Sequence, residues 1–270
     1  MLAAAAVKFK ETQTMILRRL GNKSKIAQDV IKNFPEHEIF VDMFFGAGGI
    51  FFNKPKAKYN ILNDIDSDVF NLYNVVSNSK DELKEAFEIM PIHTDLFDYW
   101  KQNKEVEPIR KAVRFLMLSN FGYMGKPDTL KMVCGNEKTQ FYKYFEATYE
   151  KIKDCRFMNF DFRKVLNKID YVSYNPVKSA FVYADPPYLE TGNNYTEIFT
   201  EQDTKDLFEL LVNSGLKFAI SEFDNDFVMS LANDYKLNVI IIGERQNMKN
   251  RRTEILVTNY KKPLSLFDGV

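Results

Sequence analysis

Short hydrophobic runs with few charges recur along the chain and alternate with stretches of helical periodicity. A strand that is buried on both faces of a sheet has such a continuous apolar run, and helices between consecutive runs are typical of a parallel sheet. We therefore predict an α/β fold. The predicted strands are Ile39–Met43, Tyr59–Leu62, Ala180–Ala184, Leu216–Ile220, Leu237–Ile242 and Glu254–Asn259.

One helix between these strands is marked at both ends. Thr200 and Asp203 have the spacing of a capping box, in which each side chain accepts a hydrogen bond from the other residue's backbone N–H. Apolar residues at helical spacing follow, and Gly215 can end the helix. A second helix is predicted over residues 224–235. The polar stretch 243–252 separates the last two strands and predicts an antiparallel hairpin with a long, basic loop.

The middle of the chain has a different pattern. From about Ser67 to Lys153 the strand signal fades and helical patterns dominate, including the amphipathic segment Arg110–Ser119. Residues 120–139 are irregular and contain several glycines. We predict that residues 67–153 form an inserted, mainly helical subdomain, and that residues 1–66 and 154–270 form one domain around it.

Composition places the chain among globular proteins. It has 270 residues, of which 45% are hydrophobic, and 37 Lys+Arg balance 37 Asp+Glu. These values exclude a disordered chain. No apolar stretch approaches the roughly 18 residues that a membrane helix needs, so no membrane association is expected. The chain has only two cysteines and no recognisable export signal, which favours the reducing cytoplasm. The spacings CxxC, HxH and HExxH do not occur, so the sequence predicts no metal site.

The charges are distributed unevenly. Residues 1–35 carry seven Lys/Arg and two Asp/Glu, residues 64–98 carry nine acidic and two basic residues, and residues 245–262 carry six basic residues and one acidic residue. Nucleic-acid binding requires a local basic patch, not a basic average. The two basic segments are therefore compatible with nucleic-acid binding, and equally with ordinary solvated helices and loops.

The first chemical motif, FVDMFFGAGGIFFNK over residues 40–54, joins a predicted strand to a glycine-rich turn. Asp42 ends the strand, and the glycines allow a ligand to approach the backbone closely. Asp64 ends the next strand, where an acid can accept hydrogen bonds from both hydroxyl groups of a ribose. The third glycine of GxGxxG is missing, and Asp42 suits a cationic group better than a pyrophosphate. We predict a nucleoside-binding βαβ unit that does not bind NAD; a plain strand, turn and helix is the alternative.

The second chemical motif, VYADPPYL over residues 182–189, ends a predicted buried strand at Asp185. Pro186 and Pro187 fix the backbone and remove two N–H donors, so that acceptors dominate this rigid corner. The Asp185 carboxylate and the Pro186 carbonyl can accept the two hydrogens of an amino group. Tyr188 can stack on the ring that carries the amino group. The carboxyl end of a strand is also where α/β sheets bind ligands.

Together the two motifs resemble those of the DNA adenine-N6 methyltransferases. The order of the motifs, the segment LGNKSK at Leu20–Lys25 and the segment NMKNRRTEILVTNY at Asn247–Tyr260 are similar to the Dam-like (D12, alpha-group) branch. The resemblance covers most of residues 15–66 and 157–260. It implies a Rossmann-like S-adenosylmethionine-dependent methyltransferase fold with a C-terminal antiparallel hairpin. It also implies that residues 1–66 and 154–270 are the catalytic domain and that residues 67–153 recognise the target.

The resemblance implies a binding site for the methyl donor S-adenosyl-L-methionine and no metal. In the family pattern Lys23 meets the donor's carboxylate, and Arg19 stands where the family usually has an aromatic residue. Asp42 lies near the donor's ammonium group, and Asp64 at its ribose. The full set of implied cofactor residues is Arg19, Lys23, Asp42, Phe44, Gly46, Gly48, Asp64, Ile65, Asp161, Phe162 and Asp185.

The resemblance also implies the reaction, which is site-specific methyl transfer to adenine N6 in double-stranded DNA after base flipping. The catalytic residues that it implies are Asp185, Pro186, Pro187 and Tyr188. The basic segment near the C-terminus and the insert are expected to contact DNA through Tyr123, Lys126, Lys131, Arg245, Lys249, Arg251 and Arg252. We expect a bacterial or viral-encoded cytoplasmic protein that is a monomer or weak dimer; a cognate restriction nuclease as partner stays open.

Three other functions remain open from the sequence. A cytosine-N4 methyltransferase presents the same acceptors to an amino group, but usually has Ser in place of Asp185. A dehydrogenase of similar fold is disfavoured by the missing glycine and by the Asp-Pro-Pro-Tyr corner. A non-catalytic DNA-binding module would bind DNA without any affinity for the methyl donor.

Overall fold

The computed structural model describes residues 15–17, 19, 21–122, 137–171, 174–189, 199–246 and 251–261. Its strands form one seven-stranded sheet in the order β3-β2-β1-β4-β5-β7-β6. The strands are β1 (Ile39–Asp42), β2 (Tyr59–Asn63), β3 (Arg156–Met158), β4 (Ala180–Ala184), β5 (Lys217–Phe223), β6 (Asn238–Gln246) and β7 (Arg251–Thr258). Strands β1 to β5 pair in parallel, whereas β7 is antiparallel to both β5 and β6.

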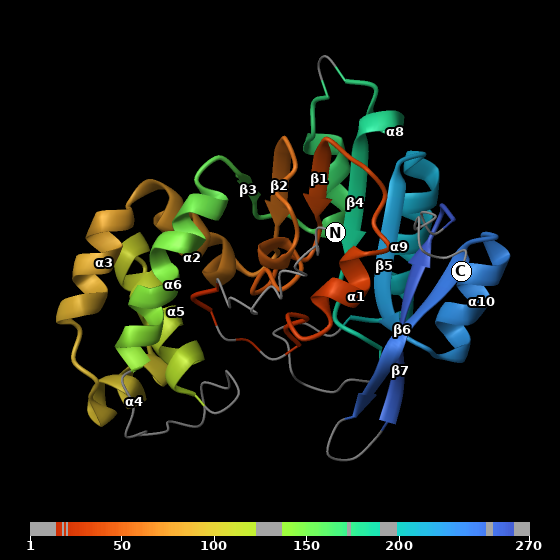
Figure 1. Ribbon diagram of the computed structural model, residues 1–270. Coiled ribbons are helices and arrows are strands. Elements are labelled where there is room, and N and C mark those ends of the chain that lie inside the picture. The colour runs from red at the N-terminus through yellow and green to blue at the C-terminus, as the bar shows by residue number, and fades with distance from the viewer. Residues whose placement is uncertain are drawn as a thin grey trace, which may run out of the picture.

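Helices cover both faces of the sheet (Figure 1). Alternate residues of β1 point to opposite faces, because successive side chains of a strand do so. Phe40 packs with one cluster, to which α1, α2, α5 and α6 contribute, and Val41 packs with another, to which α9 and α10 contribute. The α-helices of the described residues are α1 (Ala27–Ile31), α2 (Ser67–Asn78), α3 (Lys80–Ile89), α4 (Thr94–Gln102), α5 (Pro108–Phe121), α6 (Glu137–Ile152), α7 (Phe162–Val165), α8 (Pro176–Ser179), α9 (Glu201–Ser214) and α10 (Asp226–Asp234), and their 3-10 helices are η1 (Phe51–Asn53) and η3 (Leu166–Lys168).

The order of the strands creates a place for a ligand. β2 and β3 lie on one side of β1, and β4 and β5 lie on the other, so the order reverses between β1 and β4. Open α/β sheets bind ligands outside the carboxyl ends of the strands at such a reversal. Helices α3 to α6 lie beside the β3 edge, and the β6–β7 hairpin lies at the opposite end of the sheet (Figure 1).

The predicted α/β fold and its six strands are confirmed, and so is the helix with the capping box. The Thr200 and Asp203 side chains satisfy each other's backbone N–H groups, and Gly215 ends α9 in the left-handed conformation at φ 67°. Strand β3 was missed, because it has three residues and none of them is fully buried. Apolar content therefore does not mark β3 in the sequence.

Two local predictions are wrong. The polar residues on either side of the hairpin turn continue the strands, since Glu244 pairs with Thr253 and Gln246 with Arg251; no ten-residue loop exists. The connection between β1 and β2 contains the 3-10 helix η1 instead of the α-helix that a βαβ unit requires. Gly48 turns the chain there at φ 74°, and a Cβ on it would lie 2.6 Å from the Phe52 ring.

Candidate active site

A cavity of about 220 Å³ opens at the carboxyl ends of β1, β2 and β4. Both predicted motifs contribute to its walls. The predicted residues that line it are Arg19, Lys23, Asp42, Phe44, Gly46, Asp64, Ile65, Asp161, Phe162, Asp185 and Pro187. Gly48, Pro186 and Tyr188 are not among the lining residues. The fold thus brings together segments that are separated by more than a hundred residues in the sequence.

Asp64 lies opposite the glycine-rich turn and is held in place from two sides. Its Oδ2 accepts a hydrogen bond of 2.6 Å from the Gly46 backbone N–H, and its Oδ1 accepts one of 2.9 Å from the Asp66 N–H. Burial raises the pKa of Asp64, and the Arg19 guanidinium counteracts this shift. Arg19 also pairs with Asp66 at 2.9 Å, and its Nη1 is buried without a hydrogen-bond partner among the described residues.

Asp42 places an acidic group deep in the cavity. Its side chain is 2% exposed, and its Oδ1 has no hydrogen-bond partner within the described part of the chain. Burial and the neighbouring Asp185 and Asp64 carboxylates raise its pKa well above the ordinary value. A buried carboxylate beside other carboxylates is costly, and Lys54 offsets only part of this cost, so the site suits a ligand that brings a cationic group. The ammonium and sulfonium of S-adenosyl-L-methionine meet this requirement.

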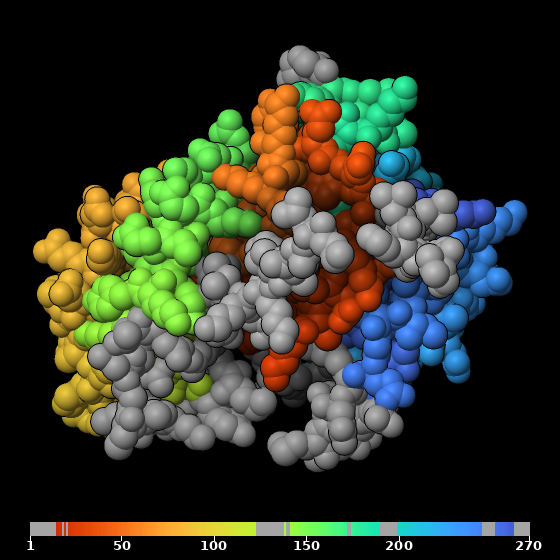
Figure 2. All heavy atoms as spheres, in the orientation of Figure 1, coloured from red at the N-terminus to blue at the C-terminus, as the bar shows by residue number. Residues whose placement is uncertain are grey.

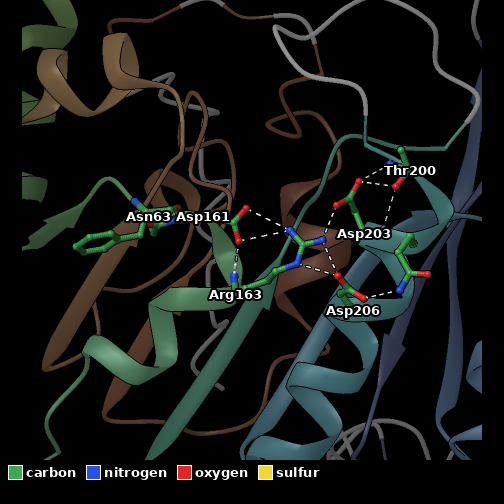
Figure 3. Close-up of polar contacts among 8 residues, drawn as sticks. Asn63, Asp161, Arg163, Thr200, Asp203 and Asp206 are labelled. Carbon is green, nitrogen blue, oxygen red and sulfur yellow. Dashed lines mark hydrogen bonds and ion pairs between the residues drawn. The ribbon is translucent and has the colours of Figure 1, made fainter.

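Arg163 holds the segment around Asp161 against the start of α9 (Figure 3). Its Nη1 lies 3.2 Å from Asp161 Oδ2, its Nη2 lies 2.5 Å from Asp203 Oδ1, and its Nε donates to Asp206 Oδ2 at 2.8 Å. Asn63 holds the other side of this segment. Its side-chain Nδ2 donates a hydrogen bond to the Phe160 carbonyl, and its Oδ1 accepts one from the Phe160 N–H. The position of Asp161 in the cavity wall is therefore set from both sides.

Three phenylalanines from three different segments form an aromatic wall of the cavity. Phe44 follows β1, Phe162 begins α7, and Phe199 precedes the cap of α9. The ring centroids are 5.6 Å apart for Phe44 and Phe162 and 5.8 Å apart for each of the other two pairs. Such a wall can pack against the flat ring of a purine. Phe199 was missed from the sequence, although its place directly before the capping box is a signal that it is fixed in space.

The Asp-Pro-Pro-Tyr corner contacts two buried charged residues. Lys23 is 2% exposed, and its Nζ lies 3.1 Å from Asp185 Oδ1 and 2.5 Å from Glu254 Oε1. The Tyr188 hydroxyl accepts a hydrogen bond from Lys23 Nζ and donates one to Glu254. The Tyr188 ring packs edge-on against Phe223, with centroids 4.5 Å apart. Tyr188 is therefore held by Lys23, Glu254 and Phe223 and does not line the cavity in this structure.

Glu222 adds a further buried carboxyl group behind this corner. It is 1% exposed, and its Oε2 has no hydrogen-bond partner among the residues that the structure describes. Burial raises its pKa to about 8; the nearby Asp185 and Glu254 carboxylates add to the shift, while the Phe223 N–H and Lys23 oppose it. Glu222 and Glu254 were not predicted, because a single acid within an apolar strand carries no recognisable pattern.

Most of the predicted DNA contacts fall outside the described residues. These are Tyr123, Lys126, Lys131 and Lys249, and of Arg245 and Arg251 only the backbone is described. Arg252 is half-buried, with its guanidinium 5.5 Å from the centre of the Phe223 ring. Residues 21–26, which precede α1, lie between helices α3 to α6 and the β6–β7 hairpin on the face shown in Figure 2.

The described parts of the chain show neither a metal-binding cluster nor a membrane-spanning helix. No cluster of three or more His, Cys, Asp or Glu side chains there has the geometry to hold a metal ion. No described helix combines the length and apolar character that crossing a membrane requires.

Comparison with known proteins gives one family for this chain. Residues 20–253 match the family model for D12 class N6 adenine-specific DNA methyltransferases. The chain is 28% identical to the DNA adenine methylase of Escherichia coli (strain K12) over 246 residues, which cover 83% of this chain and 86% of that protein. It is also 28% identical to the DNA adenine methylase of Haemophilus influenzae over 208 residues, covering 71% of this chain and 70% of that protein.

Two solved structures are similar to the chain at lower identity. An rRNA methyltransferase from Streptomyces viridochromogenes is similar at a TM-score of 0.41 and 13% identity, covering 94% of each chain. A putative methyltransferase from Streptococcus mutans in complex with SAH has a TM-score of 0.41 and 9% identity, covering 88% of this chain and 97% of that chain.

Proposed function

The chain belongs to the D12 class N6 adenine-specific DNA methyltransferase family, and we propose that it transfers the methyl group of S-adenosyl-L-methionine to adenine N6 in double-stranded DNA. One observation carries this proposal. A single cavity contains the glycine-rich turn, the acid at the end of β2 and the carboxylate of the Asp-Pro-Pro-Tyr corner. A donor and an acceptor bound in the two halves of this cavity would be neighbours.

The donor half of the cavity has the groups that the donor needs. Asp42 would face the ammonium group, and Asp64 would accept from the ribose hydroxyls while the Gly46 N–H keeps its carboxylate in place. The aromatic wall and Ile65, which is 49% exposed at the cavity, would enclose the adenine ring. Asp161 would accept a hydrogen bond from the amino group of that ring. When bound, S-adenosyl-L-methionine supplies a methyl group on a sulfonium, which is already a strong electrophile.

The corner at the end of β4 would hold the target base. The Asp185 carboxylate and the Pro186 carbonyl would accept hydrogen bonds from the two hydrogens of N6. These bonds strengthen as N6 becomes cationic, so they stabilise the transition state more than the ground state. An adenine inside a stacked duplex is out of reach of this corner, so the base must flip out, at a cost of a few kcal/mol. Tyr188 would have to turn from its contacts with Lys23 and Glu254 to stack on the flipped base, and that stacking would offset about 1–3 kcal/mol of the cost.

DNA would lie across the face that carries the segment before α1. The basic residues of this segment that do not line the cavity, and those of the β6–β7 hairpin, would contact phosphates, which position the duplex without reading its sequence. Residues 67–153 would carry target recognition. A bacterial or viral origin, a cytoplasmic location, a monomeric or weakly dimeric state and a cognate restriction nuclease stay predictions.

The test is methylation of DNA that lacks N6-methyladenine. The purified chain is incubated with labelled donor and this DNA, and the modified nucleosides are identified by mass spectrometry. We expect N6-methyladenine; N4-methylcytosine would instead support the cytosine alternative, which the corner also fits geometrically. Asp185→Ala should abolish transfer while S-adenosylhomocysteine binding, measured by calorimetry, persists. A chain that binds DNA but neither methylates it nor binds S-adenosylhomocysteine would refute the proposal.

A further inference from the structure

Two asparagine side chains connect the end of β2 with the segment that follows β3. Asn63 is the last residue of β2 and is 1% exposed. Its Nδ2 donates to the Phe160 carbonyl at 2.9 Å, and its Oδ1 accepts from the Phe160 N–H at 3.0 Å. Asn159 makes the opposite connection, because its Nδ2 donates to the carbonyls of Asp64 at 2.7 Å and Ile65 at 2.9 Å. Each segment thus holds the backbone of the other.

The strand ladder itself ends before these residues. β2 and β3 pair over three residue pairs, the last of which is Asn63 with Met158. One more backbone hydrogen bond, from the Asp64 N–H to the Met158 carbonyl, is 3.2 Å long. The amides of Asn63 and Asn159 continue the connection beyond this bond. The spacing between the two segments therefore depends on side chains here.

The residues that these amides hold line the cavity. Asp64 and Ile65 follow β2, and Phe160 and Asp161 follow β3. Ile65 is 49% exposed and Phe160 is 37% exposed. Exposed apolar side chains at a cavity mark a contact surface for a ligand, and a flat ring suits such a surface. The two asparagines fix the backbone on which this surface stands.

We propose that Asn159 is a positioning residue for the nucleoside half of the methyl donor, and that it acts together with Asn63. The inference rests on the proposed function. Asn159 is not among the residues that line the cavity, so its effect passes through the backbone of Asp64 and Ile65. Both hydrogens of its NH2 group are used, on two consecutive carbonyls. These bonds restrict the turn that carries the Asp64 carboxylate and the Ile65 side chain.

The test separates the two halves of the donor. 5′-Methylthioadenosine contains the nucleoside half without the amino acid, whereas S-adenosylhomocysteine contains both. In calorimetry, Asn159→Ala should bind both ligands more weakly by the same factor, about 5- to 20-fold, because both ligands use the same nucleoside site. Asp42→Asn is the comparison, since Asp42 would face the ammonium group. It should weaken the binding of S-adenosylhomocysteine and leave that of 5′-methylthioadenosine unchanged.

The proposed role also predicts which step is affected. At saturating donor, Asn159→Ala should methylate DNA in single-turnover experiments at a rate within about twofold of the unmodified chain. Asn159→Asp keeps the shape of the side chain but replaces the NH2 donor by an oxygen, which repels the two carbonyls. It should therefore weaken the binding of the uncharged 5′-methylthioadenosine at least as much as Asn159→Ala does.

The matched control is Asn78 on α2. It is an exposed amide whose Nδ2 also has two acceptors, the Asn74 carbonyl at 2.9 Å and Asn74 Oδ1 at 3.0 Å. Asn78→Ala should change the affinity for neither ligand. Asn159 is exposed as well, so Asn159→Ala should unfold at the same urea concentration as Asn78→Ala.

Three results would overturn the inference. The first is full affinity of Asn159→Ala and Asn159→Asp for both ligands. The second is a loss of affinity for S-adenosylhomocysteine alone, which would place the effect on the amino-acid half. The third is slower transfer at saturating donor with unchanged donor affinity.

If Asn159→Ala does not fold, Asn159→Asp decides with the same two ligands, since it keeps the shape of the side chain. Failure of the unmodified chain to methylate DNA would instead reject the proposed function. The affinities for the two ligands test Asn159 without any transfer, so the two failures are distinguishable.

Discussion

Glu222 should make the stability of this protein fall as the pH rises, and a single substitution should remove the effect. The side chain sits at the end of β5, with Oε1 accepting a 2.8 Å hydrogen bond from the Phe223 N–H and Oε2 buried without a partner among the described residues. Burial raises its pKa from 4.5 to about 8. The folded chain therefore keeps a proton at neutral pH that the unfolded chain releases.

The size of the effect follows from this difference in pKa. Below pH 4.5, the pKa of Glu222 in the unfolded chain, both states hold the proton, and the free energy of unfolding is not lowered by this group. As the pH rises, the unfolded state is favoured by about 1.4 kcal/mol per pH unit, until the folded carboxyl group also ionises near pH 8. The full difference is about 5 kcal/mol, of which roughly 3–4 kcal/mol falls between about pH 5 and about pH 8.

Glu222→Gln replaces the protonated carboxyl group by an amide of the same shape that does not titrate. Urea unfolding at about pH 5, 6.5 and 8 should therefore show a growing advantage of the variant, reaching roughly 3–4 kcal/mol more at the highest pH than at the lowest. The control is Glu209→Gln, which removes an acid that is 46% exposed and should leave the pH dependence unchanged. A constant difference between Glu222→Gln and the unmodified chain across this range would refute the reasoning.

Three other substitutions test the site and the turn. Asp64→Ala should weaken S-adenosylhomocysteine binding by about 10- to 100-fold in calorimetry and leave DNA binding nearly unchanged, since Asp64 faces the donor half of the cavity; equal losses of both would contradict this division. Gly48→Ala should lower the free energy of unfolding by about 2–4 kcal/mol in urea titrations, because the backbone φ of Gly48 is 74° and the added Cβ would lie 2.6 Å from the Phe52 ring. An unchanged free energy of unfolding would contradict this close packing. Arg163→Met should weaken donor binding by about 3- to 30-fold, because Asp161 loses its 3.2 Å contact with Arg163. The free energy of unfolding should fall by only about 1 kcal/mol, since Arg163 is 38% exposed. Unchanged donor affinity would count against the role of Asp161.

The sequence alone was sufficient for the features that depend on neighbouring residues. Strand β4 was predicted with its observed bounds, and the capping box of α9 was predicted from two residues three positions apart. Asp42, Asp64 and Asp185 were predicted to end strands at a ligand site, and all three line the cavity. Such features are readable because strand periodicity, turn chemistry and capping act within a few residues.

The tertiary structure alone decided which distant residues meet. Lys23 and Glu254 are 231 positions apart and touch because β7 inserts between β5 and β6. Phe199 reaches Phe44, and Arg163 reaches Asp203 and Asp206, only because α7 and α9 cover the same face of the sheet. A buried acid such as Glu222 has no local pattern, since its environment is formed by other strands. Strand, turn and capping preferences act between residues that are close in the chain, so the sequence shows them directly. The pairing of buried charges depends on the order of strands in the sheet, which no local pattern specifies.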